Sequence, residues 1–505
     1  MATFYKTKEN RRKKFEVLRA SLETERATFL PHWRDLSDFI LPRRAQFSTT
    51  DSHTGERRNL KIIDSTATLA ARTLRSGMMG GMTSPARPWF KLATADPYLS
   101  EVDSVKTWLH EVTQSMVAIF LRSNLYKALP LAYGDMGTFA TAAILVEEDL
   151  DTVVRFYTLP IGSYMLAVDE RGDVRVFFRE FRVTVRQLLG KFGTRTDSGE
   201  YDWSNFSSAV HDYYDKDQLD TLVTVCHVIQ PNKQYNPKSL TSKRFESVYY
   251  EKGVSGKASN NYLLDTDNEV YLRDAGYDYF PVLAPRWEVT GDDVYGTECP
   301  GMAVLGDIKA SQVLQKRKAQ AIEKMVNPPM TGPSSLRTVR TSILPGDITY
   351  SDEREGTKGF RPVHEVNIRI TELVDDIREH QARVQRGYYE DLFLMLAQLD
   401  RRQITAREVD ERHEEKLLAL GPVLEQLNQD LLDPLIDITF IMMLRQGLIP
   451  EPPEELQSSP LKVEYISVMH QAQKLAGLAG LERFTGYVAS IAQFKQDVVD
   501  KFDAD

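Results

Sequence analysis

Apolar residues recur at helical spacing in two long stretches, separated by a short insert rich in proline and glycine. The first runs from about Gly301 to Val326, and Asn327-Pro328-Pro329 ends it because proline lacks the amide hydrogen that a helix needs. The second runs from about Val366 to Ala397, and its roughly 30 residues would span about 45 Å. The apolar positions are Val304, Ile308, Leu314, Ile322 and Met325, then Val366, Ile370, Leu373, Val374, Ile377, Val384, Tyr388 and Leu392. We expect two helices that project from a body and need neighbouring copies to cover their faces.

The N-terminal part of the chain is also predicted to be helical. An amphipathic helix extends from Phe15 to Ile40, a second extends from Ser65 to Met79 and is closed by Gly80-Gly81, and residues 103–145 continue the pattern. A basic run, Lys6 to Lys14, precedes the first helix. It is either an electrostatic arm or the solvated beginning of that helix.

The hydrophobic period changes to two residues between Val153 and about Pro285, which is typical of β-strands. A turn at 169–173 joins two of these strands. The predicted strands are 153–157, 164–168, 174–178, 222–228 and one around Val248. Residues 1–300 are therefore predicted to form a mixed α+β body.

The C-terminal part returns to a helical pattern from Ile404 to Gln446, in which Gly421-Pro422 should produce a kink and Gly447 should cap the end. A strand is predicted at 461–466, with further helices from 467 to 505. In the insert, the Pro345-Gly346 turn precedes a short strand at 348–350.

Composition and charge limit the classes of function. The chain has 505 residues and a formal net charge of −9, which argues against a protein that coats nucleic acid through a basic surface. Its two cysteines, Cys226 and Cys299, indicate no disulfide framework or cysteine zinc site and fit a reducing cytoplasm. We find no apolar run long enough for a membrane span and no signal peptide.

The motifs of common enzymes are incomplete. The segment 253–258 (GVSGKA) has the wrong spacing for a nucleotide-binding phosphate loop, and His364-Glu365 lacks the second histidine of a zinc protease helix. Residues 400–416 mix basic and acidic side chains, which form either a solvated face or salt bridges between subunits. We therefore expect no enzymatic activity, metal or cofactor.

Several short segments, taken together in order and spacing, resemble those of the portal proteins, or head-to-tail connectors, of tailed bacteriophages of the podovirus kind. They cover roughly residues 60–475. These segments are 63–67 (IDSTA), 74–78 (LRSGM), 84–90 (SPARPWF), 160–164 (PIGSY), 178–180 (FRE), 295–296 (YG), 300–301 (PG), 307–309 (DIK), 327–329 (NPP), 405–409 (TAREV) and 411–412 (ER).

The resemblance implies a predominantly helical α+β subunit in a ring, usually of twelve copies, at one capsid vertex. It divides the chain into a wing body (1–300), a first stem helix (301–328), a clip (329–365), a second stem helix (366–396), a tunnel loop (397–403), a long kinked wing helix (404–450) and a C-terminal crown (451–505). Some relatives have a longer C-terminal helical barrel; because this chain stops at Asp505, we do not expect one.

The resemblance also implies partners and contact residues. Double-stranded DNA would pass through the ring, and the clip would dock the terminase large subunit first and tail adaptor proteins later, with major capsid and scaffolding proteins around the body. We expect DNA contacts from Lys316, Arg317, Lys318, Lys324, Arg401 and Arg402, and partner docking from Arg337, Arg340, Asp347, Tyr350 and Arg354. The protein would be a virion component that is assembled in the host cytoplasm and has no membrane contact.

Two other classes of function compete with this conduit. A packaging ATPase or nuclease would need a phosphate loop or converging carboxylates, and would turn over ATP or cut DNA. Another assembly component, a scaffold or tail adaptor, would bind partners without forming a large pore.

Overall fold

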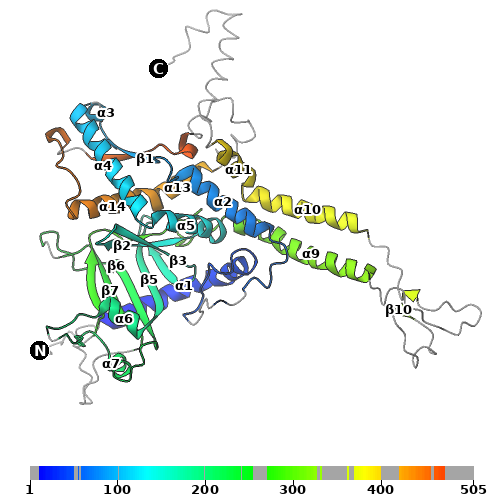
Figure 1. Cartoon of the computed structure of the whole chain (residues 1–505), viewed down its shortest axis with the longest axis horizontal. Coiled ribbons are helices and arrows are strands. Elements are labelled where there is room, and N and C mark those ends of the chain that lie inside the picture. The colour runs from blue at the N-terminus through cyan, green and yellow to red at the C-terminus, as the bar shows by residue number, and fades with distance from the viewer. Residues whose placement is uncertain are drawn as a thin grey trace, which may run out of the picture.

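The computed structural model describes residues 11–49, 55, 58–100, 102–197, 199–239, 242–253, 270–326, 330–331, 361–362, 369–399, 420–456 and 460–471. These residues form a mixed α+β body from which two helices, α9 and α10, project side by side (Figure 1). The mixed fold class that the sequence predicts is confirmed.

Four main helices precede the sheets: α1 (Arg11–Phe39), α2 (Thr66–Met82), α4 (Asp103–Arg122) and α5 (Leu125–Phe139), with a short α3 (Pro97–Ser100) between α2 and α4. Two expectations are wrong here. The helix α2 continues through Gly80-Gly81 to Met82, and the stretch 103–145 is divided between two helices and a strand. Ala140 ends α5 in a left-handed conformation, with φ of 64°. The apolar run that follows enters a sheet. The sequence did not predict this, because a short buried apolar run has no period that distinguishes a helix from a strand.

Strands β2 to β9 form a five-stranded antiparallel sheet and a three-stranded sheet. The larger has the order β4-β5-β6-β7-β8, and the smaller has the order β3-β2-β9. Their bounds are β2 Ala143–Asp149, β3 Val153–Leu159, β4 Tyr164–Val168, β5 Val174–Thr184, β6 Leu222–Pro231, β7 Phe245–Glu251, β8 Arg273–Tyr277 and β9 Val282–Leu283. All five predicted strands are confirmed.

Each face of the larger sheet is covered by helices. On one face, Phe15 and Leu22 of α1 pack against Phe178, Val228 and Val248. On the other face, the short helices α6 (Val185–Phe192) and α7 (Ser208–Asp215) cover apolar residues of β6 and β7. The alternation of strand side chains between two apolar layers explains the period of two in the sequence.

The C-terminal part returns to the body. It contains α13 (Gly421–Leu427), the π-helix η2 (Asn428–Leu432), α14 (Asp433–Arg445) and the 3-10 turn η3 (Glu454–Leu456). Pro422 lies in the first turn of α13, where its missing N–H is tolerated, and Gly447 ends α14 with φ of 66° as expected. The predicted strand is β12 (Leu461–Tyr465), which pairs antiparallel with β1 (Phe90–Thr94).

The two projecting helices are α9 (Leu305–Val326) and α10 (Ile370–Gly387). The short α8 (Pro300–Ala303) precedes α9, and α11 (Glu390–Leu399) follows α10. Toward the tip of the pair, β10 (Met330–Thr331) pairs with β11 (Arg361–Pro362). The first long helix is confirmed, with a break at Val304. The second was expected to be continuous, but it breaks at Tyr388-Tyr389, so this prediction is wrong. The strand expected at 348–350 lies outside the described residues.

Candidate functional site: the projecting helix pair and its anchor

The helices α9 and α10 run antiparallel and make contact along their length as they leave the body (Figure 1). With 22 residues, α9 is about 33 Å long. Near the body, Ile308 of α9 and Ile377 and Val384 of α10 are buried. Toward the tip this cover is lost, since Ile322, Met325 and Val326 are 41%, 52% and 80% exposed. One copy of the chain therefore leaves apolar surface on its projecting part.

A hydrogen-bond cluster around Asp64 joins the helix pair to the beginning of α2; we call it the Asp64 anchor. Its carboxylate accepts hydrogen bonds from Ser311 of α9 and from Gln381 of α10, the latter at 3.0 Å. The amide of Gln312 completes the cluster: its oxygen accepts from the backbone of Ile63 and Asp64 at 2.6 and 2.8 Å, and its nitrogen donates to the Asp64 carbonyl at 2.9 Å.

The charge of Asp64 is stabilised inside this cluster. Burial alone would raise the pKa of its carboxyl group, but hydrogen bonds from Ser311, Thr66 and Gln381 outweigh burial and lower the pKa below its ordinary value. The backbone N–H and hydroxyl of Thr66 donate at 3.0 and 2.6 Å. An ionised carboxylate thus holds both projecting helices on α2.

A second polar contact crosses between the two helices beside the anchor. Asp307 of α9 lies 2.7 Å from Nδ1 of His380 and 3.4 Å from the guanidinium of Arg383, both on α10. Together with the Asp64 anchor, this contact fixes the axial alignment of α9 against α10, because each is directional and neither can slide by a helical turn without being lost.

The base of the pair is packed tightly enough to require glycine. A Cβ atom at Gly387 would lie 2.3 Å from a methyl group of Val304, and one at Gly77 would lie 2.4 Å from the side chain of Phe393. Tyr389, between α10 and α11, has a left-handed φ of 54°. The chain therefore changes direction here, and α11 can lie against α2.

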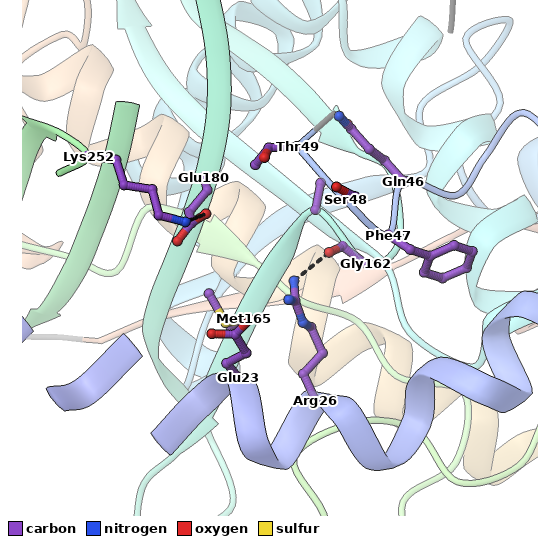
Figure 2. A pocket seen from close by; sticks show the side chains of 11 residues that line it. Glu23, Arg26, Gln46, Phe47, Ser48, Thr49, Gly162, Met165, Glu180 and Lys252 are labelled. Atoms are coloured by element: carbon purple, nitrogen blue, oxygen red, sulfur yellow. Dashed lines mark hydrogen bonds and ion pairs between the residues drawn. The ribbon is translucent and has the colours of Figure 1, made fainter. Parts of the chain in front are cut away.

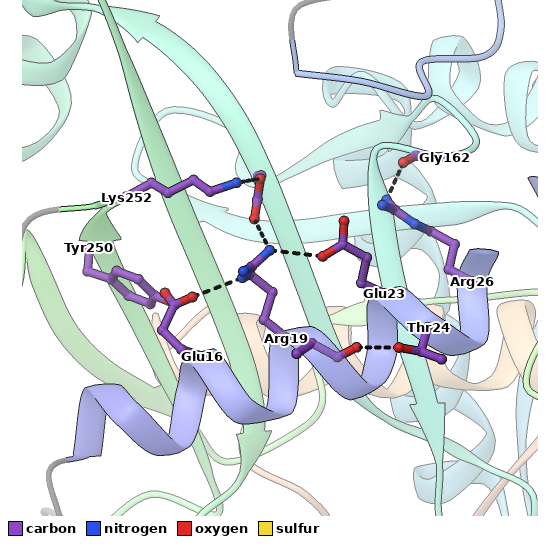
Figure 3. A network of polar contacts seen from close by, with 10 residues as sticks. Glu16, Arg19, Glu23, Thr24, Arg26, Gly162, Tyr250 and Lys252 are labelled. Carbon is purple, nitrogen blue, oxygen red and sulfur yellow. Dashed lines mark hydrogen bonds and ion pairs between the residues drawn. The ribbon is translucent and has the colours of Figure 1, made fainter.

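The body contains a cavity of about 220 Å³ between α1 and the larger sheet (Figure 2). The positive and negative side chains that line it are equal in number. Arg26 donates to the carbonyl of Gly162, and Lys252 lies 2.6 Å from Glu180. Figure 3 shows Arg19 between Glu16 and Glu23 of α1, and the guanidinium of Arg19 also lies 3.4 Å from Glu180. These contacts join α1 to the sheet and leave no excess charge to attract a ligand.

The first basic residues of α1 also join this helix to the larger sheet. Arg11 forms ion pairs with Glu246 at 2.7 Å and Asp274 at 2.5 Å, and buried Arg12 lies over the ring of Tyr250. Both expectations for the basic run, an arm or a solvated helix start, are wrong for these two residues. Lys13 and Lys14, by contrast, are exposed at the beginning of α1, as a solvated helix start predicts, and Lys6 and Lys8 lie outside the described residues.

A buried ion pair holds the C-terminal helices on the sheets. The guanidinium of Arg286 lies 3.1 Å from Asp430 in the π-helix, and only 5% and 9% of the surfaces of the two side chains are exposed. Arg286 also donates to the carbonyl of Gly172. The π-helix directs Asp430 toward Arg286, so the irregular turn has a structural reason.

Neither a metal site nor a membrane span is found in the described part of the chain. No group of three or more His, Cys, Asp or Glu side chains there is arranged to hold a metal ion. Within the same residues, no helix is both long and apolar enough to cross a bilayer.

The model of the family described as "Bacteriophage head to tail connecting protein" matches residues 12–505. The chain belongs to this family. Among its relatives, the portal protein of Salmonella phage epsilon15 is 46% identical over 488 residues, which cover 96% of this chain and 84% of the relative. The probable portal protein of Bordetella phage BPP-1 is 41% identical over 486 residues, with the same coverage of 96% and 84%.

Four of the residues that were expected to contact DNA lie on α9. Lys316, Arg317 and Lys324 are exposed on α9, and Lys318 is partly buried there. At 100° per residue, Lys316 and Lys318 point to opposite flanks of the helix, so the four do not share one face. Arg401 and Arg402 lie outside the described residues, as do the docking residues Arg337, Arg340, Asp347, Tyr350 and Arg354.

The residues of the Asp64 anchor were missed by reasoning from the sequence. The segment 63–67 contributed to the family resemblance, and Asp-Ser-Thr before an apolar helix is a signal for a helix start. That signal indicates the local role of Asp64 with Thr66. Its bonds to Ser311 and Gln381 depend on tertiary packing, which no local pattern encodes.

Proposed function

We propose that the chain is a portal subunit that assembles into a ring, usually of twelve copies, at one capsid vertex. The observation that carries this proposal is the projecting pair: α9 and α10 leave the body together and keep apolar side chains such as Ile322 and Val326 exposed. Membership of the head-to-tail connector family supports it. A closed ring of neighbouring copies would cover this surface and leave an axial hole.

In this assembly, residues 1–300 and 404–450 form the wing, 301–328 and 366–396 the stem, 329–365 the clip, 397–403 the tunnel loop and 451–505 the crown. The pairing of β12 with β1 brings 461–465 against the wing. The anchor around Asp64 then fixes the angle at which each stem leaves its wing, which all copies of a ring must share.

The ring would conduct genome DNA during packaging and ejection. A net charge of −9 keeps phosphates from adhering to the wall, because like charges within about 8–10 Å are not fully screened. A few basic side chains guide the duplex, since each exposed contact is weak and salt-dependent. The side chains that would make these contacts are Lys316, Arg317, Lys318 or Lys324 of α9, together with Arg401 and Arg402 at the tunnel loop.

The partners follow from the same assembly. The clip, with Arg337, Arg340, Asp347, Tyr350 and Arg354, docks the terminase large subunit during filling and tail adaptor proteins afterwards. Major capsid and scaffolding proteins surround the wing. The subunit itself is structural, and ATP hydrolysis belongs to the terminase. The ring is assembled in the host cytoplasm and becomes part of the virion.

The mass of the native assembly, combined with electron micrographs of its top view, tests the proposal. A ring of twelve or thirteen copies with an axial hole is the expected result. A small oligomer without a hole would overturn it in favour of another phage assembly component, such as a scaffold or tail adaptor. ATP turnover or DNA cleavage by the purified chain would instead favour a nucleic-acid enzyme.

A further inference from the structure

The described part of the chain ends just beyond β12. Ile466 donates the last hydrogen bond of the ladder between β1 and β12, at 3.0 Å to the carbonyl of Trp89. Residues 468–471 then form a helical turn, and its first two side chains, Val468 and Met469, are buried against the body. We call residues 467–471 the C-terminal root, because the remainder of the chain follows them.

The π-helix η2 contacts this root through an amide and an imidazole. The side-chain nitrogen of Asn428 lies 3.1 Å from Nε2 of His470, and Nδ1 of the same ring lies 2.8 Å from the hydroxyl of Ser467. The amide N–H donates to Nε2, so the ring carries its proton on Nδ1 and donates it to Ser467. Both nitrogens of His470 are therefore bonded, one to the body and one within the root.

The flat face of the same imidazole is held by Tyr465 of β12. The two rings are stacked with their centroids 5.1 Å apart, and the hydroxyl of Tyr465 donates to the carboxylate of Asp433. The N–H of Asp433 bonds to the carbonyl of Asn428, so these two residues lie one turn apart although they are five positions apart in sequence. In an α-helix, residues at this spacing would point about 140° apart. The π-turn thus lets Asn428 and Asp433 act on the same ring.

The contact at Asn428 leaves one polar atom without a partner. The amide oxygen of Asn428 is buried and accepts no hydrogen bond from the residues that the structure describes. Because this oxygen has lost its water without a replacement, opening of the contact would restore a hydrogen bond to it. Opening would also expose Val468 and Met469, which keeps the root closed for most of the time.

We propose that Asn428 and Tyr465 form a latch for the ring of His470, and that this latch opens while the rest of the body stays folded. The strand β12 stays paired with β1 in the open state, because the ladder ends before the root begins. The latch therefore controls whether the root, and with it the beginning of residues 472–505, is attached to the body. It lies within one copy of the chain, so the inference does not depend on the proposed ring.

Hydrogen exchange of the full-length protein, read by mass spectrometry in peptides that cover 466–474, tests the proposal. In the wild type, the amides of the root should exchange at least about tenfold faster than those of the buried helix α5, because a local opening needs less free energy than unfolding of the body. His470→Phe keeps a ring for Tyr465 but removes both nitrogens. We expect this substitution to accelerate exchange of the root at least about tenfold more.

Asn124→Ala is the matched control, because this asparagine also bonds through its amide, to the backbone of Phe156 at 2.7 and 2.9 Å, but does so away from the root. It should accelerate exchange in α5 and leave the root unchanged. If the wild-type root exchanges no faster than α5, or if Asn124→Ala accelerates the root as much as His470→Phe does, the root opens only when the body unfolds and the inference is overturned.

A double variant shows whether Asn428 and His470 act on each other. Asn428→Ala removes the same contact from the side of the π-helix, so the double variant with His470→Phe should exchange its root about as fast as the faster of the two single variants. Additive effects, or unchanged exchange in both single variants, would overturn the latch. The proposed function is decided separately, by the number of copies in the native assembly.

Discussion

The side chain of Gln381 in α10 donates a 3.0 Å hydrogen bond to Asp64, a residue that precedes it by 317 positions. The same carboxylate accepts from Ser311 of α9. A single buried acid therefore joins α2 to both projecting helices. The anchor and the packing around Gly387 both hold the projecting pair on the body.

We predict that Asp64→Ala lowers the free energy of unfolding by about 1–3 kcal/mol, because the hydrogen-bond donors of Ser311 and Gln381 lose their buried acceptor. Thermal unfolding at a fixed protein concentration measures the change. Asp38→Ala is the control, since its ion pair with Lys61 is exposed and should contribute little. An equal effect of both substitutions would show that the anchor contributes no more than a surface pair.

The anchor should also respond to acid. The pKa of Asp64 is lower in the folded chain than in the unfolded one, where it is about 3.9. Its contribution is therefore fully present above about pH 4 and is lost as the pH falls through the lowered folded value. The stability difference between wild type and Asp64→Asn should shrink below about pH 4. A difference that stays constant there would mean that the folded pKa is not lowered.

Two glycines of α2 should respond oppositely to alanine. At Gly77 a Cβ atom would meet Phe393 of α11 at 2.4 Å, whereas at Gly80 it would meet nothing within 4 Å. We expect Gly77→Ala to destabilise the chain by about 1–3 kcal/mol through overpacking. Gly80→Ala should stabilise it by up to about 1 kcal/mol, because alanine favours the helix. Unfolding midpoints measure both, and a stabilising Gly77→Ala would contradict the close packing of α2 and α11.

The pattern of the sequence predicted the elements better than the contacts between them. The bounds of β4 were predicted correctly, because its apolar run lies between Gly162 and the turn that begins at Asp169. The break at Tyr389 was missed because the apolar spacing continues through it from Val384 to Leu392. What ends the helix is tertiary: Gly387 must accommodate Val304, and α11 must reach α2. The basic residues of α9 were found, and helix geometry alone divides them among different faces; which face meets α10 depends on tertiary packing, which no local pattern encodes.

The buried ion pair of Arg286 and Asp430 gives a larger predicted effect. Asp430→Ala leaves a positive charge buried without its partner and should cost about 3–5 kcal/mol. The double variant Arg286→Met with Asp430→Leu removes both charges and should recover most of that loss. Asp220→Ala, which breaks the exposed pair with Arg186, is the matched control. A double variant as unstable as Asp430→Ala would assign the loss to packing instead of charge.

Both cysteines should be inert in the folded chain. Burial raises the pKa of the Cys226 and Cys299 thiols to about 12, so very little reactive thiolate exists at pH 8. We expect reaction with a thiol reagent at pH 8 to be more than about a thousandfold slower than for an exposed cysteine. In denaturant both thiols should react fully. Fast labelling of one thiol in the native protein would contradict its burial.

The last prediction concerns Arg401 and Arg402, which the proposed function places at the tunnel loop. Replacing both by alanine should leave ring assembly intact and alter DNA packaging or retention, because the ring would lose guiding charges and no contact between copies. Native mass measures ring assembly, and the amount of DNA packaged in assembled heads measures the loss of guidance. If rings fail to form without Arg401 and Arg402, these arginines belong to the interface between subunits, and the guidance of DNA falls to the flank of α9 that carries Lys316 or Lys318.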